Sequence, residues 1–242
     1  MRSTDLHKAI ATRDMDTLKR IVASGKDISG PITERGMTPL SHALTWNQGL
    51  KYLLKHGADV NYVGSEFKTT PLMYAAMWEH LKATQILIEA GADVNVKSEN
   101  DFTALWSGCS NDTKTREKIA FMLLDAGADV HGGKTRPVIS IAAGSSTPKV
   151  LQRLIDEGAD VNAQNDLEVC PIYMALVENK KKNLQILLDA GADPFVVVKR
   201  SKILSLDAQF PKHFGKNMIE VAQIIGSRVM TKMLEEAAAK MK

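Results

Sequence analysis

Apolar residues recur at helical spacing in several stretches of the chain. Leu50, Leu53 and Leu54 form one such set, with polar residues between them. An i, i+3, i+4 spacing places apolar side chains along one stripe of a helix, so each stretch is predicted to be an amphipathic helix. Four comparable sets follow, the first with a threonine in place of an apolar residue: Thr84, Leu87 and Ile88; Ala120, Leu123 and Leu124; Leu151, Leu154 and Ile155; Leu184, Leu187 and Leu188.

A glycine follows each of these apolar stripes. The motif reads Gly-Ala-Asp-Val-Asn at 57–61, 91–95 and 158–162, Gly-Ala-Asp-Val-His at 127–131 and Gly-Ala-Asp-Pro at 191–194. Glycine suits the left-handed position that ends a helix. Successive glycines lie 34, 36, 31 and 33 residues apart. This steady spacing indicates a repeat array with a period of about 33 residues.

A shorter helix is predicted before each stripe. Thr38 and Pro39 begin one copy and Thr70 and Pro71 another, while weaker copies lie near residues 103, 137 and 170. Threonine is a good N-cap and proline fits the first helical position. Each unit is therefore a short helix, a turn, a second helix and a loop. With its Thr-Pro-Leu-x-His-Ala segment at 38–43, the array resembles the ankyrin repeat over nearly the whole chain.

The resemblance implies an all-α repeat solenoid of stacked helix-turn-helix units with short β-hairpin loops. Residues 1–33 and 215–242 are degenerate copies that we interpret as N- and C-terminal capping repeats. Residues 34–194 hold five internal repeats, and residues 195–214 form a long loop insertion. We expect one ankyrin repeat domain across residues 1–242.

The hairpin position that usually holds glycine departs from the family pattern. It is Gly36 once, but the other copies have different residues: Lys68, Asp101, Thr135 and Glu168. Lysine, threonine and glutamate adopt the left-handed conformation poorly, so some hairpin tips are expected to be irregular.

Two insertions also depart from the pattern. Residues 110–116 lengthen the turn of the fourth unit by about three residues, and a surface bulge is the simplest reading. The loop at 195–214 is basic and aromatic, and is expected to contain an extended piece or a helical turn. It either contacts a partner or covers the edge of the core.

Composition narrows the classes of function. The chain has 31 basic and 28 acidic side chains, a net charge of +3, which argues against nucleic acid or a membrane as the main partner. No apolar run reaches the roughly 18 residues of a membrane span. Cys109 and Cys170 form no CxxC pair, so we expect them to be reduced, buried and inert in a cytoplasmic protein.

No pattern of catalysis is evident. The chain lacks GxSxG, P-loop and GxGxxG motifs, and its histidines do not fall at metal-ligand spacing. The aspartate of each Gly-Ala-Asp motif recurs once per unit and is therefore interpreted as structural. We expect no catalytic residue, no metal, no cofactor and a monomer.

The resemblance implies that proteins bind in a concave groove lined by hairpin tips and first helices. Trp46 and Trp78 share one register in successive units, so their rings are expected to lie close together, although packing on the next helix is the alternative. Tryptophan and arginine often dominate binding energy. The predicted protein-binding residues are Trp46, Trp78, Phe67, Phe102, Met37, Arg35, Met77, Asn111, Lys134 and Arg136.

The favoured function is a non-catalytic protein-protein interaction scaffold that binds one specific partner. The alternatives are a partner-recruiting subunit of an enzyme complex, a secreted effector, or an immunity protein that inhibits a toxin. An enzyme hidden in the 195–214 insertion has no support from the residues there.

Overall fold

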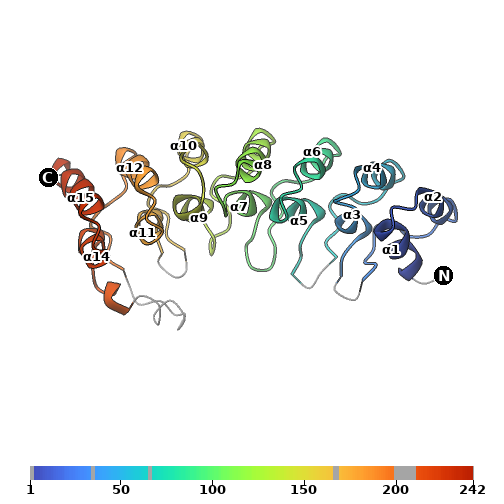
Figure 1. Ribbon diagram of the computed structural model, residues 1–242, viewed down its shortest axis with the longest axis horizontal. Coiled ribbons are helices and arrows are strands. Elements are labelled where there is room, and N and C mark those ends of the chain that lie inside the picture. The colour runs from blue at the N-terminus through green and yellow to red at the C-terminus, as the bar shows by residue number, and fades with distance from the viewer. Residues whose placement is uncertain (1–2, 34–35, 65–66, 166–168, 199–210, 242) are drawn as a thin grey trace. The chain divides into compact units, whose positions relative to one another are not determined.

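The computed structural model of the protein describes residues 3–33, 36–64, 67–165, 169–198 and 211–241. Within these residues the helices follow one another in seven pairs (Figure 1), which confirms the predicted all-α repeat architecture. The chain divides into two compact units, which we call unit 1 (Met1–Gly108 with Lys118–Asp129) and unit 2 (Cys109–Glu117 with Val130–Lys242). The prediction of a single domain stays a prediction.

Unit 1 stacks the first helix of each pair against the first helix of the next. α1 packs on α3, α3 on α5, and α5 on α7, while α4 packs on α6 in a second row. Fully buried leucines such as Leu40, Leu72 and Leu105 fill the space between the first helices. The helices are α1 (Ser3–Ala11), α2 (Met15–Ala23), α3 (Pro39–His42), α4 (Asn47–Lys55), α5 (Pro71–Met77), α6 (Leu81–Glu89) and α7 (Ala104–Gly108).

Unit 2 repeats this arrangement. α9 packs on α11 and α11 on α14, while α10 packs on α12 and α12 on α15. The division between the units falls inside α8 (Lys114–Asp125). The remaining helices are α9 (Val138–Ser145), α10 (Pro148–Asp156), α11 (Pro171–Val177), α12 (Lys181–Asp189), α14 (Met218–Ile225) and α15 (Arg228–Lys240), with the 3₁₀ helix η1 at Pro211–His213.

Local chemistry explains where the helices begin and end. The Thr38 and Thr70 hydroxyls accept the N–H groups of Ser41 and Met73 at 3.1 and 3.3 Å, as the N-cap prediction required. The glycine of each Gly-Ala-Asp motif has a positive φ, between 84° and 92°, just after a second helix. Only glycine adopts that backbone without strain, and it turns the chain into the loop.

The Gly-Ala-Asp-Val-Asn motif also joins neighbouring repeats. The Asn61 side chain accepts the N–H of Asp93 at 2.8 Å, and Asn95 accepts that of Asp129 at 2.7 Å in unit 1. Asn162 accepts the N–H of Asp193 at 2.9 Å in unit 2. These three asparagines therefore form a ladder in which each joins its own motif to the backbone of the next.

The loops between repeats turn as hairpins without regular strands. In the described part of the chain β pairing is limited to isolated bridges, such as Gly132 with Pro137. Lys68 and Asp101 do adopt the left-handed conformation, with φ of 50° and 58°. Lysine therefore occupies this position although it adopts the left-handed conformation poorly, and the tip carries backbone strain. Glu168 lies outside the described residues.

Both ends of the 195–214 insertion follow the predicted forms. Val197 bridges Asn217 in extended conformation, and Pro211–His213 is a helical turn. His213 is buried, and its Nδ1 lies 3.1 Å from the Tyr173 hydroxyl on α11. Residues 199–210, with their lysines, arginine and Phe210, lie outside the described residues.

Candidate functional site

Exposed apolar side chains gather around α5 in unit 1. Phe67, in the hairpin before α5, is 59% exposed, and Met77 and Trp78, at its other end, are 39% and 44% exposed. Trp78 stacks on Tyr74 one turn earlier, with ring centroids 4.8 Å apart. We call Phe67, Tyr74, Met77 and Trp78 the aromatic surface. Phe67 precedes α5, whose seven residues span about 10 Å, and the other three residues lie on α5 or directly after it.

Trp46 does not belong to this surface. It is 8% exposed, and its ring lies against Gly49 on α4, where an added Cβ would stand 2.1 Å from the ring. Trp46 is buried and Trp78 is exposed because the turns between the first and second helices of their repeats differ in length. Trp46 is itself the N-cap of α4, whereas two further residues separate Trp78 from α6. The prediction that both tryptophans line one groove was wrong for Trp46.

Phe102 lies in the neighbouring hairpin and packs inward. Its ring meets Trp106 edge to face at 4.6 Å, and both residues are half-buried. The two hairpins touch through the backbone, since the Glu99 N–H donates to the Phe67 carbonyl at 3.2 Å. Phe102 therefore supports the hairpin beside Phe67 and presents only part of its ring.

The other predicted residues of unit 1 are less prominent. Met37 is half-buried in its hairpin, where its N–H donates to the Thr33 hydroxyl at 3.0 Å. Arg35 lies outside the described residues.

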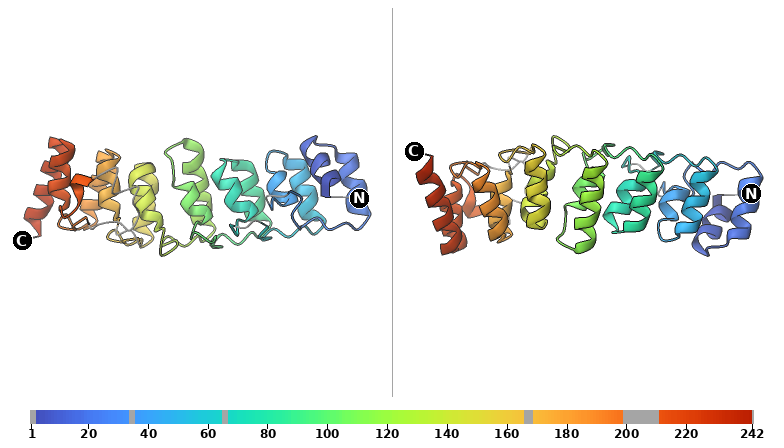
Figure 2. Two further views of the ribbon diagram at one scale, coloured as in Figure 1. Left: turned by 90° about the horizontal axis from the view of Figure 1, so that it is seen from below. Right: turned by 90° about the horizontal axis from the view of Figure 1, so that it is seen from above.

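Unit 2 holds the remaining predicted residues at two different places. Lys134 is exposed and Arg136 half-buried in the hairpin before α9, while Asn111 is exposed in the turn before α8. Hairpins and interhelix turns lie at opposite ends of the helix pairs in this unit (Figure 2). The structure therefore does not bring Asn111 together with the two basic residues.

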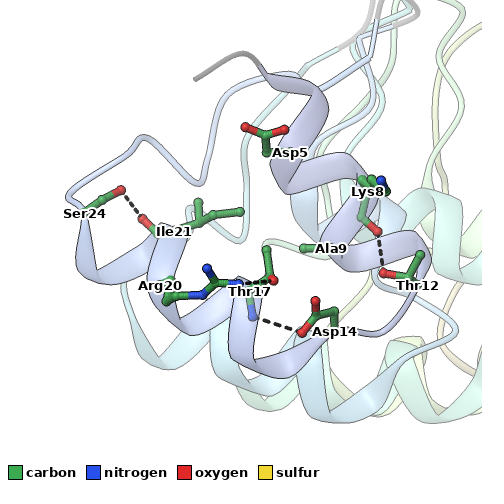
Figure 3. A pocket seen from close by; sticks show the side chains of 9 residues that line it. All are labelled: Asp5, Lys8, Ala9, Thr12, Asp14, Thr17, Arg20, Ile21 and Ser24. Carbon is green, nitrogen blue, oxygen red and sulfur yellow. Dashed lines mark hydrogen bonds between the residues drawn. The ribbon is translucent and has the colours of Figure 1, made fainter.

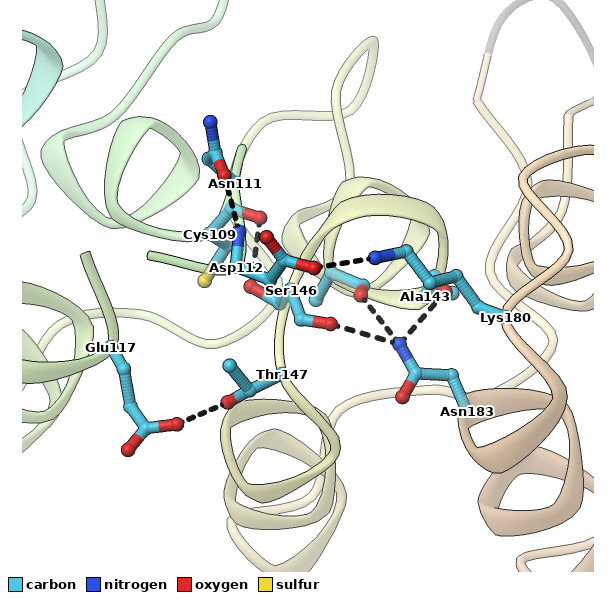
Figure 4. Close-up of polar contacts among 10 residues, drawn as sticks. Cys109, Asn111, Asp112, Glu117, Ala143, Ser146, Thr147, Lys180 and Asn183 are labelled. Atoms are coloured by element: carbon cyan, nitrogen blue, oxygen red, sulfur yellow. Dashed lines mark hydrogen bonds and ion pairs between the residues drawn. The ribbon is translucent and has the colours of Figure 1, made fainter. Parts of the chain in front are cut away.

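The turn that contains Asn111 is more than a surface bulge. Asp112 forms an ion pair of 2.8 Å with Lys180, two repeats away, and Ser146 donates its hydroxyl to the Cys109 carbonyl at 2.8 Å (Figure 4). The Thr147 hydroxyl donates to Glu117 at 2.5 Å. These contacts join this turn to the turns of the next two repeats, through Asp112 of the insertion and through Cys109 and Glu117 beside it.

Asn183 completes these connections. This α12 side chain is 1% exposed and donates from Nδ2 to three carbonyls at the end of α9: Ala142, Ala143 and Ser146, at 3.3, 3.0 and 3.1 Å (Figure 4). We call residues 110–117, 145–149 and 178–183 the turn platform. Sequence reasoning missed it, although the extra length at 110–116 was a signal.

A cavity of about 420 Å³ lies between α1 and α2 at the first pair (Figure 3). Several of its polar side chains bond to one another or to backbone. Arg20 donates to the Thr17 hydroxyl at 2.7 Å, and Asp14 accepts the Thr17 N–H at 3.0 Å. That bonding with Thr17 lowers the pKa of Asp14. We interpret the cavity as the surface of a capping repeat.

Among the described residues, no group of three or more His, Cys, Asp or Glu side chains is arranged to hold a metal ion. Cys109 and Cys170 are free and buried, as predicted. Burial raises the pKa of the Cys109 thiol to about 12 and also raises that of Cys170, so both thiols stay protonated at neutral pH.

Comparison with known proteins identifies the repeats. A model of three ankyrin repeats matches residues 62–134, and a single ankyrin repeat matches residues 35–65. The chain is an ankyrin-repeat protein. The ankyrin repeat domain of Bcl-3, a member of the IkappaB protein family, superposes with a TM-score of 0.73 at 19% identity, covering 96% of this chain and 97% of that one. The likeness shows that the ankyrin fold extends over the array.

The curated relatives described next are longer than this chain. "Ankyrin repeat and SOCS box protein 16" of Homo sapiens is 30% identical over 224 residues, which cover 86% of this chain and 48% of that protein. "Palmitoyltransferase AKR1" of Lachancea kluyveri is 26% identical over 198 residues, 78% of this chain and 27% of that enzyme. This ankyrin-repeat chain thus spans less than half the length of either relative. Among its described helices, none is both long and apolar enough to cross a membrane.

Proposed function

We propose that this ankyrin-repeat protein is a non-catalytic scaffold that binds a specific protein through the aromatic surface of unit 1. The supporting observation is the exposure of Phe67, Met77 and Trp78 around one short helix. Exposed aromatic and methionine side chains are enriched in protein interfaces and supply most of their binding energy. An apolar partner segment lying along α5 would cover both ends of the surface.

The neighbouring charges suit an apolar partner segment. Lys68 and Glu99 pair with each other at 3.7 Å beside Phe67, and Lys97 pairs with Asp129 at 3.9 Å. These exposed pairs add little stability, but they leave the hairpins near electrical balance. We assign the scaffold to the cytoplasm, because two buried free cysteines suit a reducing compartment, and we expect it to act as a monomer without nucleic acid or membrane contact.

A variant with both Phe67→Ser and Trp78→Ser tests the proposal. Immobilised wild-type chain is used to capture proteins from its native source, and the captured amounts are quantified by mass spectrometry. Loss of two anchors of about 2 kcal/mol each should reduce capture of the partner more than about 30-fold. The matched control, Val229→Ser with Met241→Ser, removes equally exposed apolar side chains of unit 2. Equal capture by wild type and the surface variant refutes the proposal.

The second candidate is a recruiting arm of an enzyme complex. It is supported by the similarity to palmitoyltransferase AKR1, of which this chain matches about a quarter. Under this function the captured protein would be a substrate of an enzyme that copurifies with the chain. Capture of the partner with no such enzyme favours the simple scaffold.

A further inference from the structure

The turn platform carries an excess of positive charge. Residues 110–117, 145–149 and 178–183 contain six basic and three acidic side chains. The basic ones are Lys114, Arg116, Lys149, Lys180, Lys181 and Lys182, and the acidic ones are Asp112, Glu117 and Glu178.

Most of the acidic groups are already engaged within the platform. Asp112 pairs with Lys180, and Glu117 accepts the Thr147 hydroxyl. In contrast, four exposed lysines form no ion pair with any residue of the described chain: Lys114, Lys149, Lys181 and Lys182. The net positive charge of the platform is therefore available to a ligand.

These lysines stand where they do not help the fold. Lys114 begins α8, Lys149 lies in the first turn of α10, and Lys181 and Lys182 begin α12. The start of a helix carries a partial positive charge and is stabilised by acidic residues, yet α10 and α12 have none in their first turns. A binding role accounts for lysines placed against this preference.

The platform is also held in one arrangement. Asn183, Ser146 and Asp112 tie its three turns together through the bonds described above (Figure 4). In unit 2 the turns follow one another along one edge (Figure 2). A rigid row of charges loses little freedom when it binds, which favours affinity.

We propose that the turn platform binds an acidic segment of a partner polypeptide. A row of turns presents lysines in series to the carboxylates of an extended chain. The three platform segments contain no aromatic residue and no large exposed apolar side chain. Single-stranded nucleic acid is held largely by stacking on aromatic rings, and peripheral membrane segments insert apolar residues, so neither fits as well.

The turn platform shares no residue with the aromatic surface, so the two proposals can fail independently. The test uses a fluorescein-labelled dodecapeptide of aspartate, with a peptide of alternating glycine and serine as the neutral probe. Fluorescence anisotropy measures binding to the full chain at two salt concentrations. Wild type should bind the aspartate probe, not the neutral one, and more weakly at the higher salt.

A variant with Lys114, Lys149, Lys181 and Lys182 all changed to Gln should bind at least about four-fold more weakly, since four exposed charge pairs with the probe are lost. The control changes four exposed lysines on other helices, Lys19, Lys51, Lys55 and Lys240, to Gln, with the same loss of net charge. It should retain binding, as should the variant with Phe67→Ser and Trp78→Ser.

Three results would overturn the proposal. The first is no binding of the aspartate probe by wild type. The second is an equal loss in both lysine variants, which would show an effect of net charge alone. The third is that wild type binds oligothymidylate, or vesicles of phosphatidylcholine and phosphatidylserine, more tightly than the aspartate probe, and loses this binding when the four platform lysines are changed. Either finding would assign the platform to another class of ligand.

Discussion

Replacing Asn183 with alanine tests whether a single buried amide holds unit 2 together. Its Nδ2 group has two hydrogens and three carbonyl acceptors within 3.3 Å, so at least one hydrogen is shared. The acceptors lie at the end of α9, where helical N–H partners run out. The amide on α12 therefore caps a helix of the preceding repeat.

The expected loss is about 3 kcal/mol of unfolding free energy. Each hydrogen bond contributes about 1 kcal/mol net, and a buried carbonyl left without a partner costs about 1–3 kcal/mol. Asn183→Asp should cost more, about 3–5 kcal/mol, because it places an unpaired carboxylate against three carbonyls.

Urea denaturation followed by circular dichroism measures the global effect. Because repeat arrays can unfold in parts, hydrogen exchange should be measured as well. Faster exchange is expected in α9 and α12. The control is Gln185→Ala on the exposed side of the same helix, where the side chain donates to Asp189 at 2.8 Å. That change should cost no more than about 0.5 kcal/mol.

A loss below about 0.5 kcal/mol for Asn183→Ala would refute the reasoning, since it would leave the amide no more important than a surface residue. Equal stability of Asn183→Asp and wild type would refute it independently. That result would show that the carbonyls of Ala142, Ala143 and Ser146 do not depend on a hydrogen-bond donor from α12.

Three further predictions concern other parts of the fold. Trp46→Ala should cost about 3–5 kcal/mol in urea unfolding, and Trp78→Ala about 1 kcal/mol or less, because only Trp46 is buried; equal costs would contradict the different placement of the two rings. Lys68→Gly should raise stability by about 0.5–1 kcal/mol by relieving a positive φ, net of the entropy that glycine loses, and an unchanged midpoint would show that the hairpin is unstrained. Burial lowers the pKa of His213, so its neutral form favours folding. That contribution is complete above the unfolded pKa of about 6.5 and is lost as the pH falls toward the folded value. The melting temperature should fall between pH 7.5 and 5.5, and less so in His213→Asn, whereas identical pH profiles would exclude this residue as a cause.

The repeats themselves could be read from the sequence because their chemistry is local. A threonine cap, a proline at the first helical position and a glycine after the helix act within a few residues of the chain. Thr70 and Gly91, for example, take the predicted cap and left-handed roles. Such signals repeat in register, so each copy supports the reading of the others.

The candidate site was harder to predict because it depends on differences between copies. Trp46 and Trp78 stand at the same distance from their Thr-Pro motifs, but Gly57 is the 19th residue after Thr38 and Gly91 the 21st after Thr70. The shorter spacing was the signal that one ring becomes a helix cap and packs on Gly49. Asn183 gave no such signal, since its three acceptors come from another repeat.

The asparagine ladder has a consequence for how such a chain can change over generations. Asn61, Asn95 and Asn162 each bind a main-chain N–H of the next motif, a group that every residue except proline possesses. A repeat that is duplicated, lost or exchanged therefore meets a valid partner at its new border without a compensating substitution. The joint between repeats is generic, which leaves the exposed side chains of each copy free to diverge toward new partners.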